Sequence, residues 1–222
     1  MLHSFGTSLI FKPMIKLNDA LRWRYATQIF DTSKELSQEA LEEILEAGNL
    51  AATAYGLQPF EFIMVKDQAV KDSLLAASFG QEHAVKNSVL VVIAIRTDID
   101  EAYISEYIER ISKIRNIPIE SLDGFKQSML SDMSSRTPEN RNEYAAKNAF
   151  IALGTMMAAA SELGVDNHAM LGFDPDQYDQ LLNLKDNLHS SVILALCHRS
   201  PDDVWQGYAK VRKNYEDIVT II

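Results

Sequence analysis

The sequence predicts a single domain that combines α-helices with β-strands, and three observations support this. The 222 residues contain no internal repeat and no linker rich in Pro, Gly or Ser, which favours one domain. Apolar residues recur at helical spacing in some segments, whereas branched and aromatic residues cluster as strands in others. The hydrophobic content of 47% is enough for a buried core, so disorder is not expected.

The first half of the chain contains two helix patterns and two strand patterns. Ser37 can cap a helix that runs to about Thr53. The apolar positions of that helix fall on one stripe, made by Ala40, Ile44, Ala47 and Ala51 with Leu41 and Leu45 beside it. Residues 60–65, FEFIMV, read as a strand, and a helix near 67–77 follows. The run SVLVVIAI at 88–95 is apolar throughout, which suits a central strand covered on both faces.

The next part of the chain is predicted to be mostly helical. Residues 99–116 read as an amphipathic helix whose apolar positions are Tyr103, Tyr107, Ile111 and Ile114. Residues 120–141 are polar and irregular, and we expect them to be partly helical and mobile, as a lid would be. Residues 143–164 form a long helix without charge between Lys147 and Glu162. A helix that is apolar all round is buried on all sides, so we expect a partner subunit to cover part of it.

The end of the chain is predicted to contain one more helix and two strands. Asp174 and Pro175 start the helix, because aspartate is a favoured cap and proline fits the first turn. The segment SSVILALCHR reads as a buried strand, in which Cys197 is a packed thiol rather than a nucleophile. The tail YEDIVTII would be an adhesive edge if left unpaired, so it must join a sheet of its own subunit or of a partner.

Charge and missing motifs exclude several classes of function. A net charge of −10 argues against general binding to nucleic acid or to anionic membranes. No export signal or membrane span is recognised, so a cytoplasmic protein is expected. Met14 is an alternative start, which would make residues 1–13 a loose extension.

The GxGxxG, GxxxxGK[ST] and GxSxG patterns are absent, and the five histidines show no metal-ligand spacing. We therefore expect no metal site, and any enzyme chemistry would belong to a bound organic cofactor.

Two basic clusters stand out in this acidic chain. The first is the RWR stretch at 22–24, and the second is YAKVRKNYED, in which Lys210 and Arg212 are two positions apart. Residues at that spacing point the same way on an extended segment. Arginine binds phosphate through a planar fork and lysine adds a point charge. Each cluster alone reads more readily as a solvated surface, whereas the two together predict one phosphate site.

Four separated motifs resemble the flavin-dependent nitroreductase family. They are LRWRYATQIFD, AYGLQPFEFIMV, GFDPDQYDQLL and KVRKNYEDIV, in the family's order and spacing from about residue 17 to the end. The resemblance implies an α+β fold with a mixed central β-sheet flanked by helices. It also implies a homodimer whose C-terminal arms are exchanged, with FMN at the subunit interface. Members pass a hydride from NADH or NADPH through FMN to a nitro group, quinone or similar small acceptor, in a ping-pong mechanism.

The resemblance also assigns cofactor-binding residues and no catalytic side chain, because FMN carries the chemistry. Arg24 matches the arginine that grips the FMN phosphate, and Lys210 and Arg212 match its C-terminal partners. Arg22 has no firm counterpart. The other matched positions line the flavin: Tyr25 and Ala26 in a short loop, Thr53, Ala54 and Tyr55 from the neighbouring subunit, Gln81 and His83 near the ring and ribityl chain, and Met170, Leu171 and Gly172 against the ring.

Three positions depart from the family pattern. Gln28 stands where lysine or arginine is usual, Leu171 where glutamate is frequent and Ala54 where serine is frequent. A cation near the flavin N1–C2 edge favours the anionic reduced ring. Because Gln28 carries no charge, we expect a lower reduction potential of the flavin, or a stabilisation of the reduced ring by His83 instead.

The alternatives to a nitroreductase function are a dehalogenase or azoline-type dehydrogenase of the same family, a flavin-binding protein without turnover, and a dimeric structural domain without cofactor.

Overall fold

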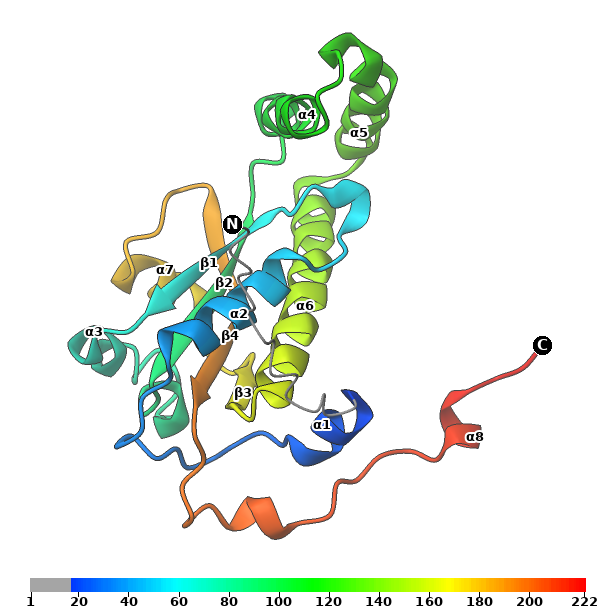
Figure 1. The fold of residues 1–222 in the computed structure, drawn as a ribbon. Coiled ribbons are helices and arrows are strands. Elements are labelled where there is room, and N and C mark those ends of the chain that lie inside the picture. Colours follow the sequence, from blue (N-terminus) through cyan, green and yellow to red (C-terminus); the bar gives the residue numbers. More distant parts are fainter. Residues whose placement is uncertain (1–16) are drawn as a thin grey trace, which may run out of the picture.

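The computed structural model describes residues 17–222, and the prediction for residues 1–13 lies outside this part. Its centre is a four-stranded sheet of order β1-β2-β4-β3 (Figure 1). The strands are β1 (Phe60–Val65), β2 (Val89–Arg96), β3 (Asp166–Met170) and β4 (Leu188–Cys197). The helices are α1 (Leu17–Trp23), α2 (Gln38–Asn49), α3 (Gln68–Ser73), α4 (Glu101–Arg115), α5 (Asp123–Ser135), α6 (Pro138–Glu162), α7 (Pro175–Leu181) and α8 (Tyr215–Ile218). Short 3₁₀ turns are η1 (Ala54–Gly56), η2 (Glu82–Ala84), η3 (Ile119–Leu122) and η4 (Val204–Gly207).

The sheet separates two apolar clusters, one on each face. Successive residues of β2 contribute to opposite clusters, because side chains alternate along a strand. Val91 packs on the face covered by α2 and α6, and Val92 packs on the face covered by α7 and the segment after α3. Every residue from Val89 to Ile95 is buried, so the prediction of a central strand covered on both faces is confirmed.

Local sequence signals account for the helix starts. The Ser37 side chain accepts a hydrogen bond from Ala40 N and caps α2, and Asp174 does the same for α7 with Gln177 N. Both predicted starts are therefore confirmed. The long helix begins earlier than predicted, because Thr137 caps it and Pro138 occupies its first turn.

The α+β class is confirmed, although the sheet is antiparallel in its three strand pairings. A parallel pairing of the kind expected for a mixed sheet is the isolated bridge between Ala26 and Asn167. This bridge attaches the loop after α1 to β3. Within residues 17–222, the helices are too short or too polar to cross a membrane.

Several boundaries differ from the predictions. The helix expected near 67–77 ends at Ser73, and the segment that follows forms turns. The segment 120–141 is more regular than expected: it contains η3, α5 and the start of α6. Met129 and Met133 are one helical turn apart and buried against α4, which explains why a mostly polar segment is helical. Ile114 is 75% exposed and does not belong to the buried face of α4. α1 and β3 have no counterpart in the prediction.

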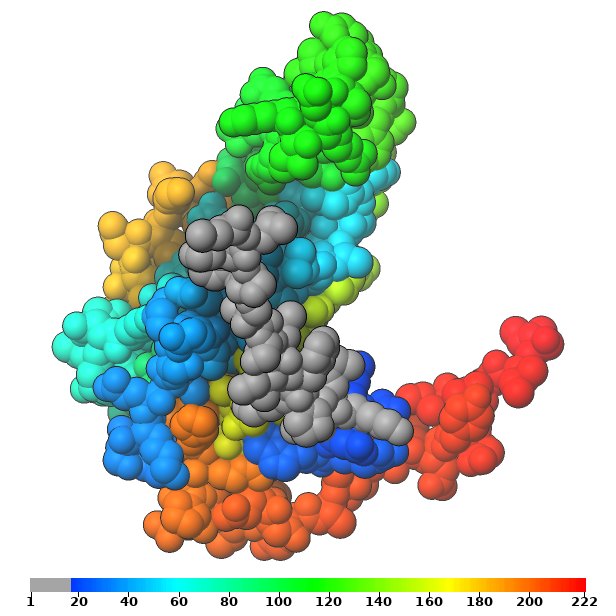
Figure 2. All heavy atoms as spheres, viewed as in Figure 1, coloured from blue at the N-terminus to red at the C-terminus, as the bar shows by residue number. Residues whose placement is uncertain are grey.

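The C-terminal arm, which we define as residues 208–222, does not form the expected strand in its own subunit's sheet. It runs beside α1 and then projects from the body, as Figure 2 shows. Its end is the short helix α8 and an extended segment, with Ile218 72% and Ile221 88% exposed. The open edge strand of the described sheet, β1, lies away from this arm (Figure 1). Of the two pairings that the sequence leaves open for the tail, the one within the same subunit is therefore absent among residues 17–222, and pairing with a partner subunit stays a prediction.

Candidate functional site

Both basic clusters line one pocket of about 500 Å³. The loop that follows α1 forms one wall, and η4 with the first part of the C-terminal arm forms the other. The lining residues are Arg22, Trp23, Arg24, Tyr25, Ala26, Gln28, Trp205, Gln206, Tyr208, Ala209, Lys210, Val211 and Arg212. The structure thus brings together the three cations that the sequence predicts to share a phosphate.

The three cations repel one another, and the described residues supply no carboxylate to them. Burial, followed by the charge of Arg212, lowers the pKa of Arg24. Burial, followed by the charges of Arg24 and Arg212, lowers the pKa of Lys210. Arg24 Nε is buried without a hydrogen-bond partner in the described structure. A buried unpaired donor beside two further cations fits a bound anion such as a phosphate.

Lys210 also has a structural role. Its ammonium donates hydrogen bonds to the backbone oxygens of Leu21, at 2.5 Å, and of Arg24. These carbonyls lie at the end of α1, where helix carbonyls lack intrahelical partners. An ammonium has three donors, so one remains for an anion. Arg22 is different, because it pairs with Asp19 on the exposed surface at 2.9 Å.

Aromatic rings on both sides of Arg24 hold a different arginine. The guanidinium carbon of Arg199 lies 4.2 Å from the ring centroid of Trp23 and 4.7 Å from that of Tyr25. Arg199 also pairs with the buried carboxylate of Asp166 through Nε at 2.6 Å. Trp23 and Tyr25 therefore contact Arg199 through their rings, while Arg24, which stands between them in the sequence, lines the pocket.

A buried carboxylate, Asp203, ties this loop to the segment before the arm. It accepts hydrogen bonds from Tyr25 Oη at 2.9 Å and from Gln28 N at 2.8 Å. Burial, then the hydrogen bond to Asp203, raises the pKa of Tyr25 to about 12. Burial alone would raise the pKa of Asp203, but the backbone hydrogen bonds of Ile29 and Gln28 lower it overall. Asp203 therefore stays ionised and fixes the loop.

A second group of predicted residues gathers around β3 and η2. The rings of His83 and His168 are stacked with centroids 4.1 Å apart, and His168 Nδ1 lies 2.8 Å from Thr27 O. Because a carbonyl can only accept, His168 carries its proton on Nδ1. Burial, then His168, lowers the pKa of His83 to about 4. Two neutral imidazoles therefore lie behind the loop that carries Arg24.

Gln81 connects this group to the loop after β3. Its Nε2 donates to Gly172 O at 2.5 Å and to Ser78 O at 3.0 Å. Met170 is buried in the core, whereas Leu171 is 64% exposed. Of the three residues predicted to lie against the flavin ring, Leu171 and Gly172 are thus exposed to solvent, whereas Met170 is part of the buried core.

The third predicted group lies apart from the others in a single chain. Ala54 N donates to Asn148 Oδ1 at 2.7 Å, and Tyr144 Oη donates to Ala54 O at 2.9 Å. Both partners belong to the N-terminal half of α6, whereas α1 lies at its other end (Figure 1). The structure therefore does not bring Thr53, Ala54 and Tyr55 to the cation pocket of the same chain.

Tyr55 has a constrained backbone. Its φ of 62° is in the left-handed region, and its carbonyl accepts from Tyr107 Oη at 2.7 Å. Such strain persists only where neighbours enforce it, and here hydrogen bonds to α4 and α6 hold η1 in this conformation.

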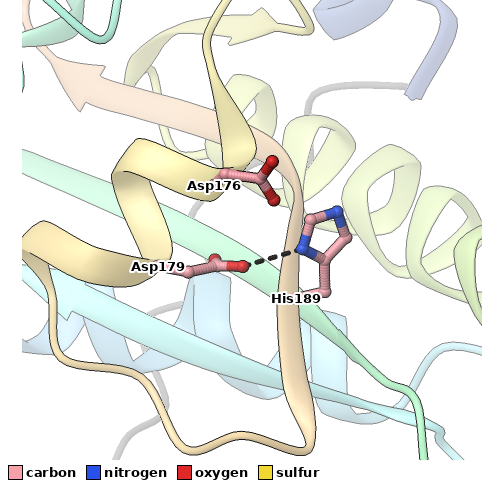
Figure 3. A group of neighbouring side chains, drawn as sticks. All are labelled: Asp176, Asp179 and His189. Atoms are coloured by element: carbon pink, nitrogen blue, oxygen red, sulfur yellow. Dashed lines mark hydrogen bonds and ion pairs between the residues drawn. The ribbon is translucent and has the colours of Figure 1, made fainter.

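A cluster of metal-type ligands lies elsewhere, on α7 and β4 (Figure 3). Asp176, Asp179 and His189 have possible ligand atoms within 4.8 Å of one another. His189 Nδ1 lies 2.7 Å from Asp179 Oδ2, and Ser190 N donates to Asp179 Oδ1 at 2.9 Å. Asp179 thus has protein partners that join α7 to β4, and Asp176 is exposed.

Sequence reasoning missed four residues of the site: Asp166, His168, Arg199 and Asp203. A usable signal existed for Asp203, because aspartate is a favoured residue at the start of a helical turn, and it does cap η4 through Trp205 N. The other three depend on contacts between distant segments and have no local signature.

The chain is similar to known proteins in sequence and in fold. A family model described as "Nitroreductase family" matches residues 21–198. A Staphylococcus aureus protein named as an NAD(P)H nitroreductase is 31% identical over 210 residues, which cover 90% of this chain and 93% of the relative.

Solved structures show the same fold at lower identity. The nitroreductase YdfN of Bacillus subtilis has a TM-score of 0.83 at 21% identity, over 92% of this chain and 98% of that one. A nitroreductase of Exiguobacterium sibiricum, solved in complex with FMN, has a TM-score of 0.80 at 18% identity, over 94% of this chain and 98% of that one.

Proposed function

The chain belongs to the nitroreductase family, and from this we propose that it is an FMN-dependent oxidoreductase that takes a hydride from NADH or NADPH. The acceptor is a small molecule such as a nitro compound or a quinone, and oxidation and reduction alternate in a ping-pong cycle. One observation carries the proposal: Arg24, Lys210 and Arg212 converge from both ends of an acidic chain on one pocket, without a carboxylate among the described residues to neutralise them. NADH and NADPH are cytoplasmic reductants, and we propose that the enzyme works there.

Each group of residues has a distinct task. The three cations hold the phosphate of FMN. Gln81, His83, Leu171 and Gly172 lie along the ring, and the loop from Tyr25 to Gln28 closes the side of the site. When bound, FMN supplies the hydride chemistry, so no side chain needs to act as an acid or a base in the hydride step. The protein binds, orients and shields the reactants.

We propose that the complete site needs two subunits. Thr53, Ala54 and Tyr55 lie at the other end of α6 from the cations, so they reach a flavin only from a second copy. The exposed side chains of Phe150 and Ile151 on α6, 40% and 48%, supply an apolar face for that copy.

The C-terminal arm completes the dimer in this proposal. β1 pairs with β2 on one side and has an open edge on the other. A groove of about 660 Å³ runs beside it, lined by apolar Leu45, Phe60 and Phe62 among polar residues. The β-branched end of the arm would pair with the open edge of β1 in the second copy. This pairing would cover both the exposed edge strand and the exposed end of the arm.

The decisive experiment uses the colour of the purified protein. We expect a yellow protein, or one that becomes yellow with added FMN, that NADH or NADPH bleaches without oxygen. A nitro compound or a quinone should then restore the colour. A yellow protein that neither nucleotide bleaches would be a flavin-binding protein without turnover, and a protein that cannot take up FMN would contradict the proposal.

A further inference from the structure

Asp203 joins the two segments that carry the cations. Its Oδ2 accepts hydrogen bonds from Tyr25 Oη at 2.9 Å, Gln28 N at 2.8 Å and Ile29 N at 3.1 Å. Its Oδ1 accepts from Trp205 N at 3.0 Å. One carboxylate therefore fixes the chain just after Arg24 and starts the turn that leads to the C-terminal arm.

The Asp203 carboxylate is buried, yet within residues 17–222 it forms no salt bridge that would neutralise its charge. Asp203 is 0% exposed, and the hydrogen bonds made to it come from three backbone N–H groups and a phenol. No lysine or arginine of residues 17–222 forms a salt bridge with it. Burying a charge is costly, and charge-assisted hydrogen bonds from well-placed donors are what can offset the cost. The arrangement thus uses a buried charge to hold two loops in one geometry.

A second contact restrains the same loop independently. Arg199, just after β4, lies over the rings of Trp23 and Tyr25 and pairs with buried Asp166. The side chains on both sides of Arg24 are therefore held by Arg199, and the backbone that follows is held by Asp203. With both contacts in place, the Arg24 guanidinium is directed into the pocket.

We propose that Asp203 is a positioning residue for phosphate binding: it holds Arg24 opposite Lys210 and Arg212. It thereby determines how much more tightly the protein binds FMN than riboflavin, which lacks the phosphate. This inference rests on the proposed FMN function. It assigns Asp203 no contact with the flavin.

The test is the ratio of two affinities in a conservative variant. In Asp203→Asn, an amide replaces a carboxylate that only accepts. Whichever way the amide turns, its NH₂ faces a donor, either Trp205 N or the three donors at Oδ2. Asp202→Asn is the matched control, because Asp202 is adjacent and exposed and the charge change is the same. The dissociation constants of FMN and riboflavin are measured for the wild type and both variants.

We expect Asp203→Asn to weaken FMN binding by about tenfold, which corresponds to about 1.4 kcal/mol. Riboflavin binding by that variant, and both affinities of Asp202→Asn, should match the wild type. Equal losses for FMN and riboflavin, or no loss for FMN, would overturn the inference alone. A wild type that binds neither flavin would overturn the proposed function together with it.

A milder variant covers the case in which Asp203→Asn does not fold. Tyr25→Phe removes one donor to Oδ2 and keeps the ring that contacts Arg199. Tyr25 also lines the proposed flavin site, so the variant is judged by the ratio of the two affinities: we expect FMN to lose about threefold more affinity than riboflavin. An unchanged FMN-to-riboflavin ratio in Tyr25→Phe would overturn the inference.

Discussion

Lys210 and Arg24 are in direct contact although 186 positions separate them: the Lys210 ammonium donates a hydrogen bond to the backbone oxygen of Arg24. Its second bond, to Leu21 O at 2.5 Å, satisfies another carbonyl at the end of α1. A cation at a helix C-terminus is favourable, so this contact anchors the start of the C-terminal arm. As a result, Arg212 lies near Arg24, and beyond this point the arm projects from the body (Figure 2).

The first prediction concerns assembly. We expect a homodimer by sedimentation, because α6 exposes Phe150 and Ile151 and because the proposed flavin site would be incomplete in one chain. Ile151→Glu should yield a monomer that has lost FMN, since a buried unpaired carboxylate costs several kcal/mol at an apolar interface. Leu181→Glu on α7 is the control, because Leu181 is similarly exposed, at 46%, and α7 lies away from α6 (Figure 1). A folded wild-type monomer at low concentration would contradict the account.

The second prediction concerns Gln28, whose side chain lines the pocket and donates to Ala26 O at 3.0 Å. Gln28→Lys should raise the reduction potential of the bound flavin, because it adds a positive charge where the reduced ring becomes negative. Gln28→Glu should lower it. The potentials are measured by equilibration with a reference dye. An unchanged or lower potential in Gln28→Lys would show that this position does not act on the ring.

The third prediction concerns pH and the stacked histidines. The pKa of His83 is lowered to about 4 by burial and by His168, from an ordinary value of 6.5. The neutral ring is favoured in the folded protein, so its stabilisation is present above pH 6.5 and is lost as the pH falls towards 4. Partial exposure reduces the effect, which we place at about 1–3 kcal/mol.

His83→Leu should remove that part of the pH dependence. Urea unfolding of the apoprotein is compared at about pH 7 and about pH 4.5 for wild type and variant. The stability of the wild type should fall more between the two conditions than that of His83→Leu. Parallel losses in both proteins would mean that other groups carry the acid sensitivity.

The fourth prediction concerns the packing of α2 on α6. A Cβ at Gly48 would lie 2.7 Å from Met156 Cγ and 2.9 Å from Phe62 Cζ. Gly48→Ala should therefore destabilise the protein by about 1 kcal/mol, because the crowding exceeds the gain in helix propensity. Gly124→Ala in α5 meets nothing within 4 Å and should be neutral or stabilising. Thermal unfolding of both variants checks the opposite signs.

Much of the fold is predictable because its signals are local. β1, β2 and β4 consist of apolar runs, and α2 and α7 have side-chain caps at the predicted residues. β3 was missed because Asp166, Asn167 and His168 are polar and not typical of a strand. Its conformation depends on pairing with β4, which is a tertiary effect. Where the arm pairs could not be predicted from the residues alone, because a β-branched tail indicates an adhesive segment without indicating its partner strand.

The residues of the candidate site also fall into those that the sequence predicts and those that only tertiary contacts reveal. The gathering of Arg24, Lys210 and Arg212 in one pocket could be predicted, because cations that cluster in an acidic chain indicate a shared anion. Asp203 and Arg199 could not be predicted, because their roles come from contacts with a loop about 175 positions earlier in the chain. Such residues are visible only once the fold has brought the two segments together.

The most direct test of the central claim is the binding of FMN and riboflavin to Arg212→Ala. A charge-assisted contact with phosphate contributes about 1.5–3 kcal/mol, so FMN binding should weaken by roughly ten- to a hundredfold. Added salt should close part of the gap between wild type and variant, since it screens the charges. Riboflavin should bind both proteins almost alike. If Arg212→Ala instead weakens riboflavin as much as FMN, Arg212 supports the fold or the dimer, and the pocket between the two basic clusters is not the phosphate site.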